Sequence, residues 1–201
     1  NNYRLLLNNI FSCLILILLP SLTGMIVLSK QIVLFLAGES FVEAYITLQI
    51  LSFALCFAVV GGIITNCINI PLGYEKVNLK ATSIAATINV LLNMLFIPQF
   101  KQNGTAFTTM IAEAIVIIIC MLCNKKIISL FNKKIILESF IHSGIGCIII
   151  IGTYYALVYF INKDIILVLL TILLSCVFYL FILLILKNRF VVSIVRKALF
   201  K

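Results

Sequence analysis

Six long apolar stretches separated by short polar gaps dominate this chain of 201 residues. The chain is 64% hydrophobic and 10% charged, and its mean hydropathy is +1.26. A soluble domain has about half apolar and about a quarter charged residues. So much apolar surface does not fit inside a soluble core of this size, so lipid must surround the helices. The sequence therefore predicts an all-α, polytopic integral membrane helix bundle, formed as one transmembrane domain over residues 1–201.

Each apolar stretch is long enough to cross a bilayer, which takes about 20 helical residues. The first stretch is longer than a span requires and contains Pro20, so we expect it to be tilted or kinked. Pro and Gly mark the turns between stretches, and we expect Pro98 to end the third helix. Two basic segments with interspersed apolar residues, 125–138 and 187–201, are typical of helices that lie on the membrane surface. The six expected membrane helices cover residues 10–36, 45–70, 79–97, 105–123, 140–161 and 165–186.

The positive charges occupy alternate gaps between these stretches. Only Lys30, Lys101 and Lys163 lie in the opposite gaps, out of fifteen Lys and Arg residues. Short loops rich in Lys and Arg stay on the cytoplasmic side of a membrane. We therefore expect a bacterial inner-membrane protein with both termini of this segment in the cytoplasm. The twelve residues on that side are Arg4, Lys76, Lys80, Lys125, Lys126, Lys133, Lys134, Lys187, Arg189, Arg196, Lys197 and Lys201.

The net charge of +9 follows from this arrangement. Anionic lipids attract basic residues at the cytoplasmic membrane edge, so membrane lipids are expected partners and nucleic acid is not. The polar stretch from Asn1 to Asn9 is expected to be a loop that follows an earlier helix. We interpret the chain as the C-terminal part of a larger transporter; the alternative is a complete six-helix protein that lacks only its start.

Nothing in the sequence predicts a catalytic centre, a metal site or a cofactor. Cys120 and Cys123 form a C-x-x-C pair inside an apolar stretch, without a second pair nearby. A structural zinc site needs four ligands, so we interpret the seven cysteines as small packing residues. The single histidine, His142, is expected at the inner membrane interface. We therefore expect a transporter and not an enzyme.

Two charged residues are expected within the bilayer. Glu113 follows Gly104 by nine positions, which places it roughly 14 Å below the outer surface at 1.5 Å per residue. A carboxyl group at that depth is either a proton- or cation-responsive group or a neutral group hydrogen-bonded to a neighbouring helix. Lys30 lies in the outer half of the first span, where it either pairs with Glu113 or extends outward to the interface.

Asparagines are the other polar candidates at membrane depth. Asn89 and Asn93 are four positions apart and share one face of a helix. Asn66 and Asn69 lie near the inner end of the second span. Each pair has two interpretations: hydrogen bonds between helices, worth about 0.6 kcal/mol each in membranes, or the lining of a substrate or ion pathway.

Several motifs in this order resemble the C-terminal half of Wzx-type O-antigen and polysaccharide flippases, which belong to the multidrug/oligosaccharidyl-lipid/polysaccharide exporter superfamily. The resemblance extends from Pro20 to Lys126. It rests on three runs: Ile32-Val33-Leu34-Phe35-Leu36-Ala37-Gly38-Glu39-Ser40-Phe41; Ile70-Pro71-Leu72-Gly73-Tyr74-Glu75-Lys76 followed by Asn89, Asn93 and Pro98; and Gly104-Thr105-Ala106 followed by Ile111-Ala112-Glu113.

The resemblance implies a transporter of 12–14 helices in two lobes, of which this chain would be most of the second. It implies a flippase for undecaprenyl-pyrophosphate-linked oligosaccharide repeat units, used to build O-antigen, capsule or other surface polysaccharide. Alternating access by rocking lobes is implied, with H+ or Na+ as coupling ion and other polysaccharide-assembly proteins as partners. Lys76 and Lys80 would meet the lipid phosphate at the cytoplasmic mouth.

Two other functions stay open from the sequence. A cation-coupled exporter of drugs or small molecules in the same superfamily would share the fold. A membrane enzyme of polysaccharide assembly, a polymerase or acyltransferase, would need acid, base or cationic groups gathered at an aqueous face. The expected outer loops offer few such groups, so we prefer the flippase.

Overall fold

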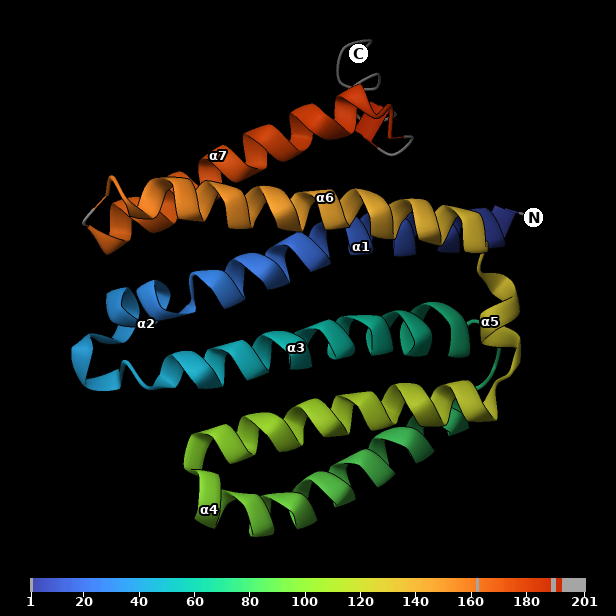
Figure 1. Ribbon diagram of the computed structural model, residues 1–201. Coiled ribbons are helices and arrows are strands. Elements are labelled where there is room, and N and C mark those ends of the chain that lie inside the picture. The colour runs from blue at the N-terminus through green and yellow to red at the C-terminus, as the bar shows by residue number, and fades with distance from the viewer. Residues whose placement is uncertain (1, 162, 189–190, 193–201) are drawn as a thin grey trace. The chain divides into compact units, whose positions relative to one another are not determined.

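The computed structural model describes residues 2–161, 163–188 and 191–192, which form helices joined by short turns (Figure 1). No strand occurs in these ranges. By their internal contacts the residues form two compact units. Unit 1 comprises Asn1–Gly38 and Lys133–Lys201, and unit 2 comprises Glu39–Asn132. Most of the expected surface helix over residues 187–201 lies outside the described residues.

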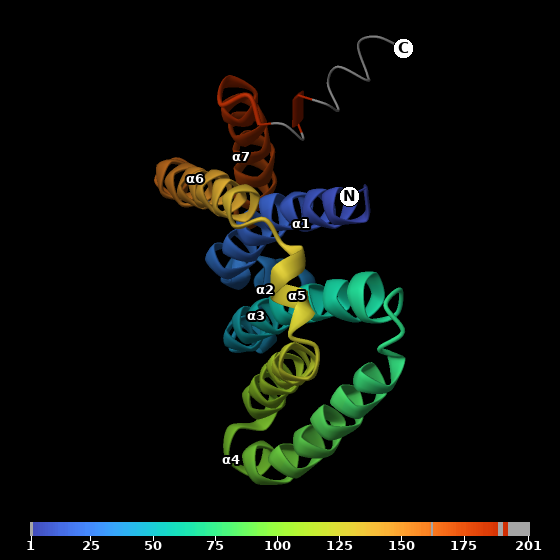
Figure 2. The same ribbon diagram turned by 90° about the vertical axis from the view of Figure 1, so that its right-hand side faces the viewer.

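Among its described residues, unit 1 has four helices: α1 (Asn2–Val27), α2 (Ser29–Ala37), α6 (Lys133–Val158) and α7 (Asp164–Ile185). α1 packs lengthwise against α6, as Figures 1 and 2 show, and α7 packs against α6 and α2. α7 matches the sixth expected helix within one residue at each end. Unit 1 is therefore a small bundle in which the first and the last two predicted spans lie together.

The start of α1 corrects an expectation. The stretch that begins the chain is helical from Asn2 onward and is not a loop. Leu7 is 2% exposed and Asn8 4% exposed, and the Asn8 carboxamide donates to the Arg4 carbonyl at 2.7 Å. Because Asn8 satisfies its donor within the helix, an asparagine here does not interrupt it. The break in this span comes at Leu28 (φ −93°, ψ 5°), between α1 and α2.

Pro20 sits at a junction of three helices in unit 1. Proline has no N–H, so the Leu16 carbonyl, four residues earlier, lacks its usual helical donor. The Tyr179 hydroxyl of α7 donates to that carbonyl at 2.9 Å. Gly146 of α6 makes room for this contact, because an added Cβ would lie 2.7 Å from the Tyr179 ring and 2.9 Å from Pro20. The free carbonyl left by the proline is thus used to join α7 to α1.

Unit 2 contains a short 3₁₀ turn η1 (Glu39–Phe41), α3 (Ala44–Gly62), a π-helical segment η2 (Ile63–Asn69), α4 (Glu75–Cys123) and α5 (Lys126–Leu130). α4 bends sharply at Lys101 (φ 49°, ψ −129°) into two arms, residues 75–100 and 102–123. Figure 1 shows the arms lying antiparallel, with the second arm between α3 and the first.

The bend divides α4 into two arms that are each long enough to span a membrane. Five described helices are long and apolar enough to span a membrane, and α4 is one of them. Each of its two arms exceeds the roughly 20 residues that a span requires, so the two arms supply two crossings. The first arm continues through Pro98 to residue 100, so the helix ends three residues later than the expected end at residue 97.

The two arms approach closely next to the bend at Lys101. A Cβ added to Gly104 would lie 2.5 Å from the Phe96 carbonyl oxygen and 2.8 Å from its carbon. The Phe96 ring stacks against those of Phe100 and Phe107, each at 5.8 Å between centroids. Only glycine permits this contact between backbones, so Gly104 sets how tightly the hairpin closes.

The expected basic surface segment over residues 125–138 is divided in the structure. Lys126–Leu130 forms the short helix α5, anchored by Ile127, which is 0% exposed. Residues 133–138 are the first turns of α6, which begins seven residues before the expected membrane helix. The lysine pair at 133 and 134 therefore stands on a membrane helix rather than on a separate surface segment.

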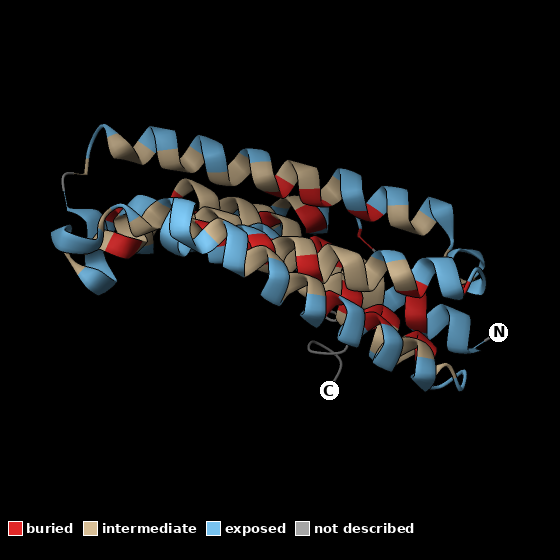
Figure 3. Cartoon of the chain, turned by 90° about the horizontal axis from the view of Figure 1, so that it is seen from below, coloured by how far each residue is buried: buried red, intermediate tan, exposed pale blue. Residues whose placement is uncertain are grey.

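The helix surfaces are largely apolar and exposed. Figure 3 shows buried residues as short red segments among half-buried and exposed ones. Large side chains such as Met94 (71% exposed) and Leu122 (68%) face outward. A soluble protein rarely exposes so much contiguous apolar surface. The predicted all-α, polytopic membrane helix bundle is confirmed.

Candidate functional site

Several polar contacts join the helices of unit 2. Where α3 packs against the second arm of α4, the contacting residues differ in number by a constant amount. The Thr47 hydroxyl donates to the Asn103 carboxamide oxygen at 2.5 Å, between residues 56 positions apart. An added Cβ at Gly61 would lie 3.6 Å from Ile117, again 56 positions away. Because the separation stays constant, the two helices run parallel. Glu113, one turn before Ile117, is therefore level with Phe57 of α3.

Glu113 is half-buried on this second arm. It makes no hydrogen bond or ion pair with another residue in the described part of the chain. It follows Ala112, which is 9% exposed, and precedes Ile117 by four positions, so it shares the side of the helix that meets α3. Its role in ion response stays a prediction.

Lys30 is the second residue of α2, directly after the break at Leu28, and it is exposed. It belongs to unit 1, whereas Glu113 belongs to unit 2. Pairing between the two charges therefore stays a prediction. The break at Leu28 is consistent with the alternative in which Lys30 extends toward the interface.

Asn89 and Asn93 lie together, as their spacing predicts. The Asn93 carboxamide nitrogen donates to Asn89 Oδ1 at 3.0 Å, and Asn93 Oδ1 accepts from the Thr108 hydroxyl at 2.6 Å. Thr108 is 0% exposed and lies on the other arm of α4. Asn93 therefore joins the two arms, whereas Asn89 contacts only Asn93 on its own arm. A role in lining the substrate pathway stays a prediction.

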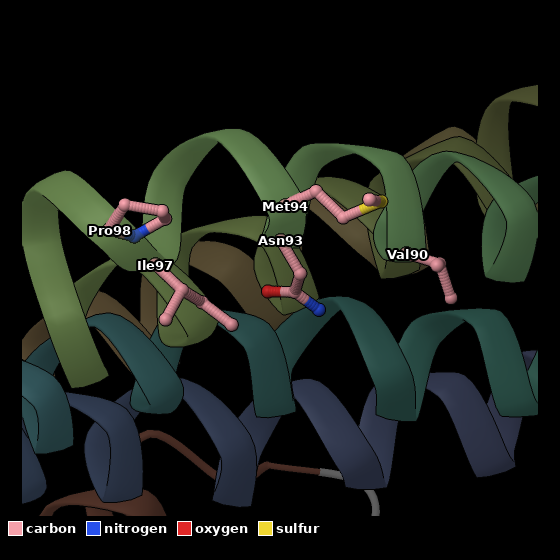
Figure 4. A pocket seen from close by; sticks show the side chains of 5 residues that line it. All are labelled: Val90, Asn93, Met94, Ile97 and Pro98. Atoms are coloured by element: carbon pink, nitrogen blue, oxygen red, sulfur yellow. The ribbon is translucent and has the colours of Figure 1, made fainter.

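An open groove of about 400 Å³ runs beside Asn93 on the first arm. Figure 4 shows the Asn93 carboxamide on the same side of the helix as Val90 and Ile97, with Met94 and Pro98 completing the lining. Four of these five residues are apolar. A groove of this composition suits a hydrocarbon chain better than sugar hydroxyls or phosphate.

The two members of the other asparagine pair, both in η2, have different surroundings. Asn69 is 0% exposed, whereas Asn66 is exposed. Asn69 Nδ2 donates to Asn78 Oδ1 at 2.7 Å, and Asn124 Nδ2 donates to Asn69 Oδ1 at 3.1 Å. Asn78 and Asn124 were missed by the sequence reasoning. Their only signal is that each lies at the inner end of an apolar stretch, where an asparagine resembles an ordinary turn residue.

Lys76 and Lys80 lie on the first two turns of α4, and both are exposed. Their spacing of four positions places both amines on one side of the helix. They follow the turn that connects η2 to α4. The geometry leaves both amines free to meet an anion, and their role at a cytoplasmic mouth stays a prediction.

Within the described residues, no group of three or more His, Cys, Asp and Glu side chains is arranged to hold a metal ion. The His142 ring Nδ1 instead lies 2.8 Å from the carboxamide nitrogen of Asn188, which joins α6 to the segment after α7. The chemistry of the site therefore rests on amides, hydroxyls, one carboxyl group and lysine amines.

Comparison with known proteins gives one structural likeness. Neither the models of protein families nor the curated proteins searched contain a match to this chain. The solved structure "Lipid II flippase MurJ, inward closed conformation" matches with a TM-score of 0.73 and 21% sequence identity. The match covers 100% of this chain and 40% of that protein. The chain therefore has the fold of a polytopic membrane transporter and spans less than half of that flippase's length.

Proposed function

We propose that this chain is part of a flippase that carries a lipid-linked sugar precursor across the membrane. The observation that carries the proposal is the shared fold with a lipid II flippase, at a TM-score of 0.73 over the whole chain. The sequence motifs point independently to a flippase of the multidrug/oligosaccharidyl-lipid/polysaccharide exporter superfamily. The structural match and the sequence motifs point to the same class of cargo, a sugar attached to a lipid.

The specific cargo that we propose is an undecaprenyl-pyrophosphate-linked repeat unit for O-antigen or another surface polysaccharide. Lys76 and Lys80 would attract the pyrophosphate on the cytoplasmic side, since lysine amines bind phosphate as point charges. Glu113, without a partner among the described residues, would respond to the coupling ion, H+ or Na+. Two lobes would open alternately to either side, and the second lobe would include this chain.

A second candidate cargo is lipid II itself. It is favoured by the same structural match, because the matching protein is named for that substrate. Both cargoes combine a long lipid, a phosphate-containing link and sugars, so one fold serves either. A cation-coupled exporter of drugs is the remaining alternative.

Depletion of the full-length protein in its own cell separates these cargoes. Loss of surface polysaccharide with intact peptidoglycan would support the repeat-unit flippase. Lysis with accumulation of lipid II would favour the second candidate. Raised drug sensitivity with both polymers unchanged would refute a flippase for lipid-linked sugars.

The proposed cytoplasmic mouth has its own test. The double variant Lys76→Ala/Lys80→Ala should lower export in the depleted cell. The matched control is Lys125→Ala/Lys126→Ala, which removes two exposed charges from the same predicted side. Both variants weaken the positive-inside signal equally. Equal loss of export in both would assign Lys76 and Lys80 to membrane orientation alone.

A further inference from the structure

The segment η2 continues α3 in a wider helical turn. The Ile70 amide donates to the Thr65 carbonyl at 3.1 Å, five residues back, instead of the four of an α-helix. The segment then ends in a Schellman cap, in which the Tyr74 amide donates to the Asn69 carbonyl at 2.8 Å and the Gly73 amide to the Ile70 carbonyl at 3.0 Å, with Gly73 at φ 76°. π-helical turns are rare and occur most often at functional sites. Something must therefore hold the backbone of Ile63–Asn69 in this arrangement.

A directed chain of side-chain hydrogen bonds ends on that segment. The Lys126 amide donates to Asn124 Oδ1 at 3.3 Å, and Asn124 Nδ2 donates to Asn69 Oδ1 at 3.1 Å. Asn69 Nδ2 donates to Asn78 Oδ1 at 2.7 Å, and Asn78 Nδ2 donates to the Thr65 carbonyl at 3.1 Å. We name Asn124, Asn69 and Asn78 the asparagine relay. Every carboxamide in it donates forward and accepts from behind.

Two of the three relay members are buried, Asn78 is half-buried, and the relay joins four segments. Asn69 is 0% exposed and Asn124 is 2% exposed. The members come from η2, from the start of the first arm of α4 and from the residue after the second arm, and Lys126 opens α5. Hydrogen bonds aligned in this way polarise one another in a medium of low dielectric constant. A break at one link therefore weakens the others.

The Thr65 carbonyl is where the relay meets the backbone. In an α-helical turn this oxygen would accept from the Asn69 amide, four residues on. In the structure it accepts from the Ile70 amide and from the Asn78 carboxamide together. The second donor compensates for the poorer hydrogen-bond geometry of the wide turn and is available only from α4.

We propose that the asparagine relay is a latch that holds η2 in its wide register and couples it to the position of α5. When Asn78 lets go of Thr65, the wide turn opens more often, so the amides of residues 63–70 exchange faster. From this open state the segment can close again with α-helical hydrogen bonds, which turns the following loop about the helix axis. This makes η2 a two-position joint at the end of α3. The latch itself does not depend on the cargo; only its use in a transport cycle rests on the proposed flippase function.

Hydrogen–deuterium exchange of the purified full-length protein tests the latch. Asn78→Leu keeps the branched side-chain shape and the number of heavy atoms, and it removes the relay's contact with Thr65. A hydrogen bond between membrane helices is worth a factor of about 3, so losing two should speed exchange across residues 63–70 about eightfold. The matched control is Asn93→Leu, which removes contacts of the same kind between the two arms of α4 and should leave exchange at residues 63–70 unchanged.

The coupling to α5 has a separate readout. Asn124→Ala should speed exchange both at residues 63–70 and at residues 126–130. The proposal is overturned if Asn78→Leu leaves η2 as protected as in the wild type, or if Asn93→Leu exposes it equally. If Asn78→Leu does not accumulate in membranes, Asn78→Ser, which is too short to reach the Thr65 carbonyl, is measured in its place with the same expectation. If Asn78→Leu speeds exchange as expected but depletion of the wild-type protein leaves surface polysaccharide and peptidoglycan unchanged, the flippase proposal is refuted and the latch stands.

Discussion

Adding a single methyl group at Gly104 should force apart the two arms of α4. The new Cβ of Gly104→Ala would lie 2.5 Å from the Phe96 carbonyl oxygen and 3.3 Å from the Ile97 nitrogen. Both neighbours are backbone atoms, so no side-chain rotation relieves the clash. The arms must separate by about 0.9 Å at this point to restore ordinary contact at 3.4 Å.

The expected loss of stability follows from that displacement. Overpacking of a tight contact costs about 1–3 kcal/mol. The same movement stretches the 2.6 Å bond from Thr108 to Asn93, and its loss adds about 0.6 kcal/mol. Alanine regains about 1 kcal/mol of helix propensity over glycine. We therefore expect a net destabilisation of about 1–3 kcal/mol.

Thermal unfolding of the purified protein in detergent measures the effect. The melting temperature should fall by roughly 2–4 °C for each kcal/mol in a chain of this size. The matched control is Gly152→Ala in α6, where an added Cβ meets nothing within 4 Å, so the melting temperature should stay level or rise. An unchanged melting temperature for Gly104→Ala would refute the close approach of the two arms.

Four further outcomes are expected. Tyr179→Phe removes the donor to the Leu16 carbonyl and should lower the free energy of unfolding by about 0.6 kcal/mol, read from the melting temperature; no change would show that the bond contributes nothing. Lys101→Gly should raise the free energy of unfolding by about 1 kcal/mol, because the positive φ of 49° strains a residue with a side chain. A lower melting temperature of this variant would contradict the positive φ at the bend. Glu113→Gln should abolish surface polysaccharide while the protein still reaches the membrane, and normal export would make the carboxyl group structural. If position 30 lines the cavity, Lys30→Cys in a background without the other cysteines should react with an impermeant thiol reagent, and a substrate analogue should slow that reaction. A reaction rate that the analogue does not change would place the residue at the interface.

The spans could be predicted because hydropathy alone determines them. The last helix differs from expectation by one residue at each end, since Asp164 and Lys187 bound an unbroken apolar run. The first helix begins at Asn2, earlier in the chain than the expected start at residue 10. Asn8 resembles a loop residue in the sequence, but in the structure its carboxamide donates to the Arg4 carbonyl within the helix. Proline was a poor guide to the end of the third span, where Pro98 lies inside the helix.

The polar contacts were predicted only where they are local. Asn89 and Asn93 share a face because helical periodicity requires it, and the structure places them 3.0 Å apart. The partners of Asn69 lie 9 and 55 positions away, and no pattern within one helix indicates such contacts. The wide turn of η2 depends on the same distant carboxamides, so its register follows from tertiary packing and not from local propensity.

The most direct test of the account is translocation by the full-length protein in vesicles. A lipid-linked oligosaccharide pyrophosphate is placed in both leaflets, and an impermeant enzyme that cleaves the sugar reports the accessible pool, with and without a gradient of H+ or Na+. The account predicts that the enzyme reaches the substrate of both leaflets in vesicles that contain the protein, and only that of the outer leaflet in protein-free vesicles. Cleavage limited to the outer leaflet in both preparations would contradict the claim that this chain belongs to a flippase for lipid-linked sugars.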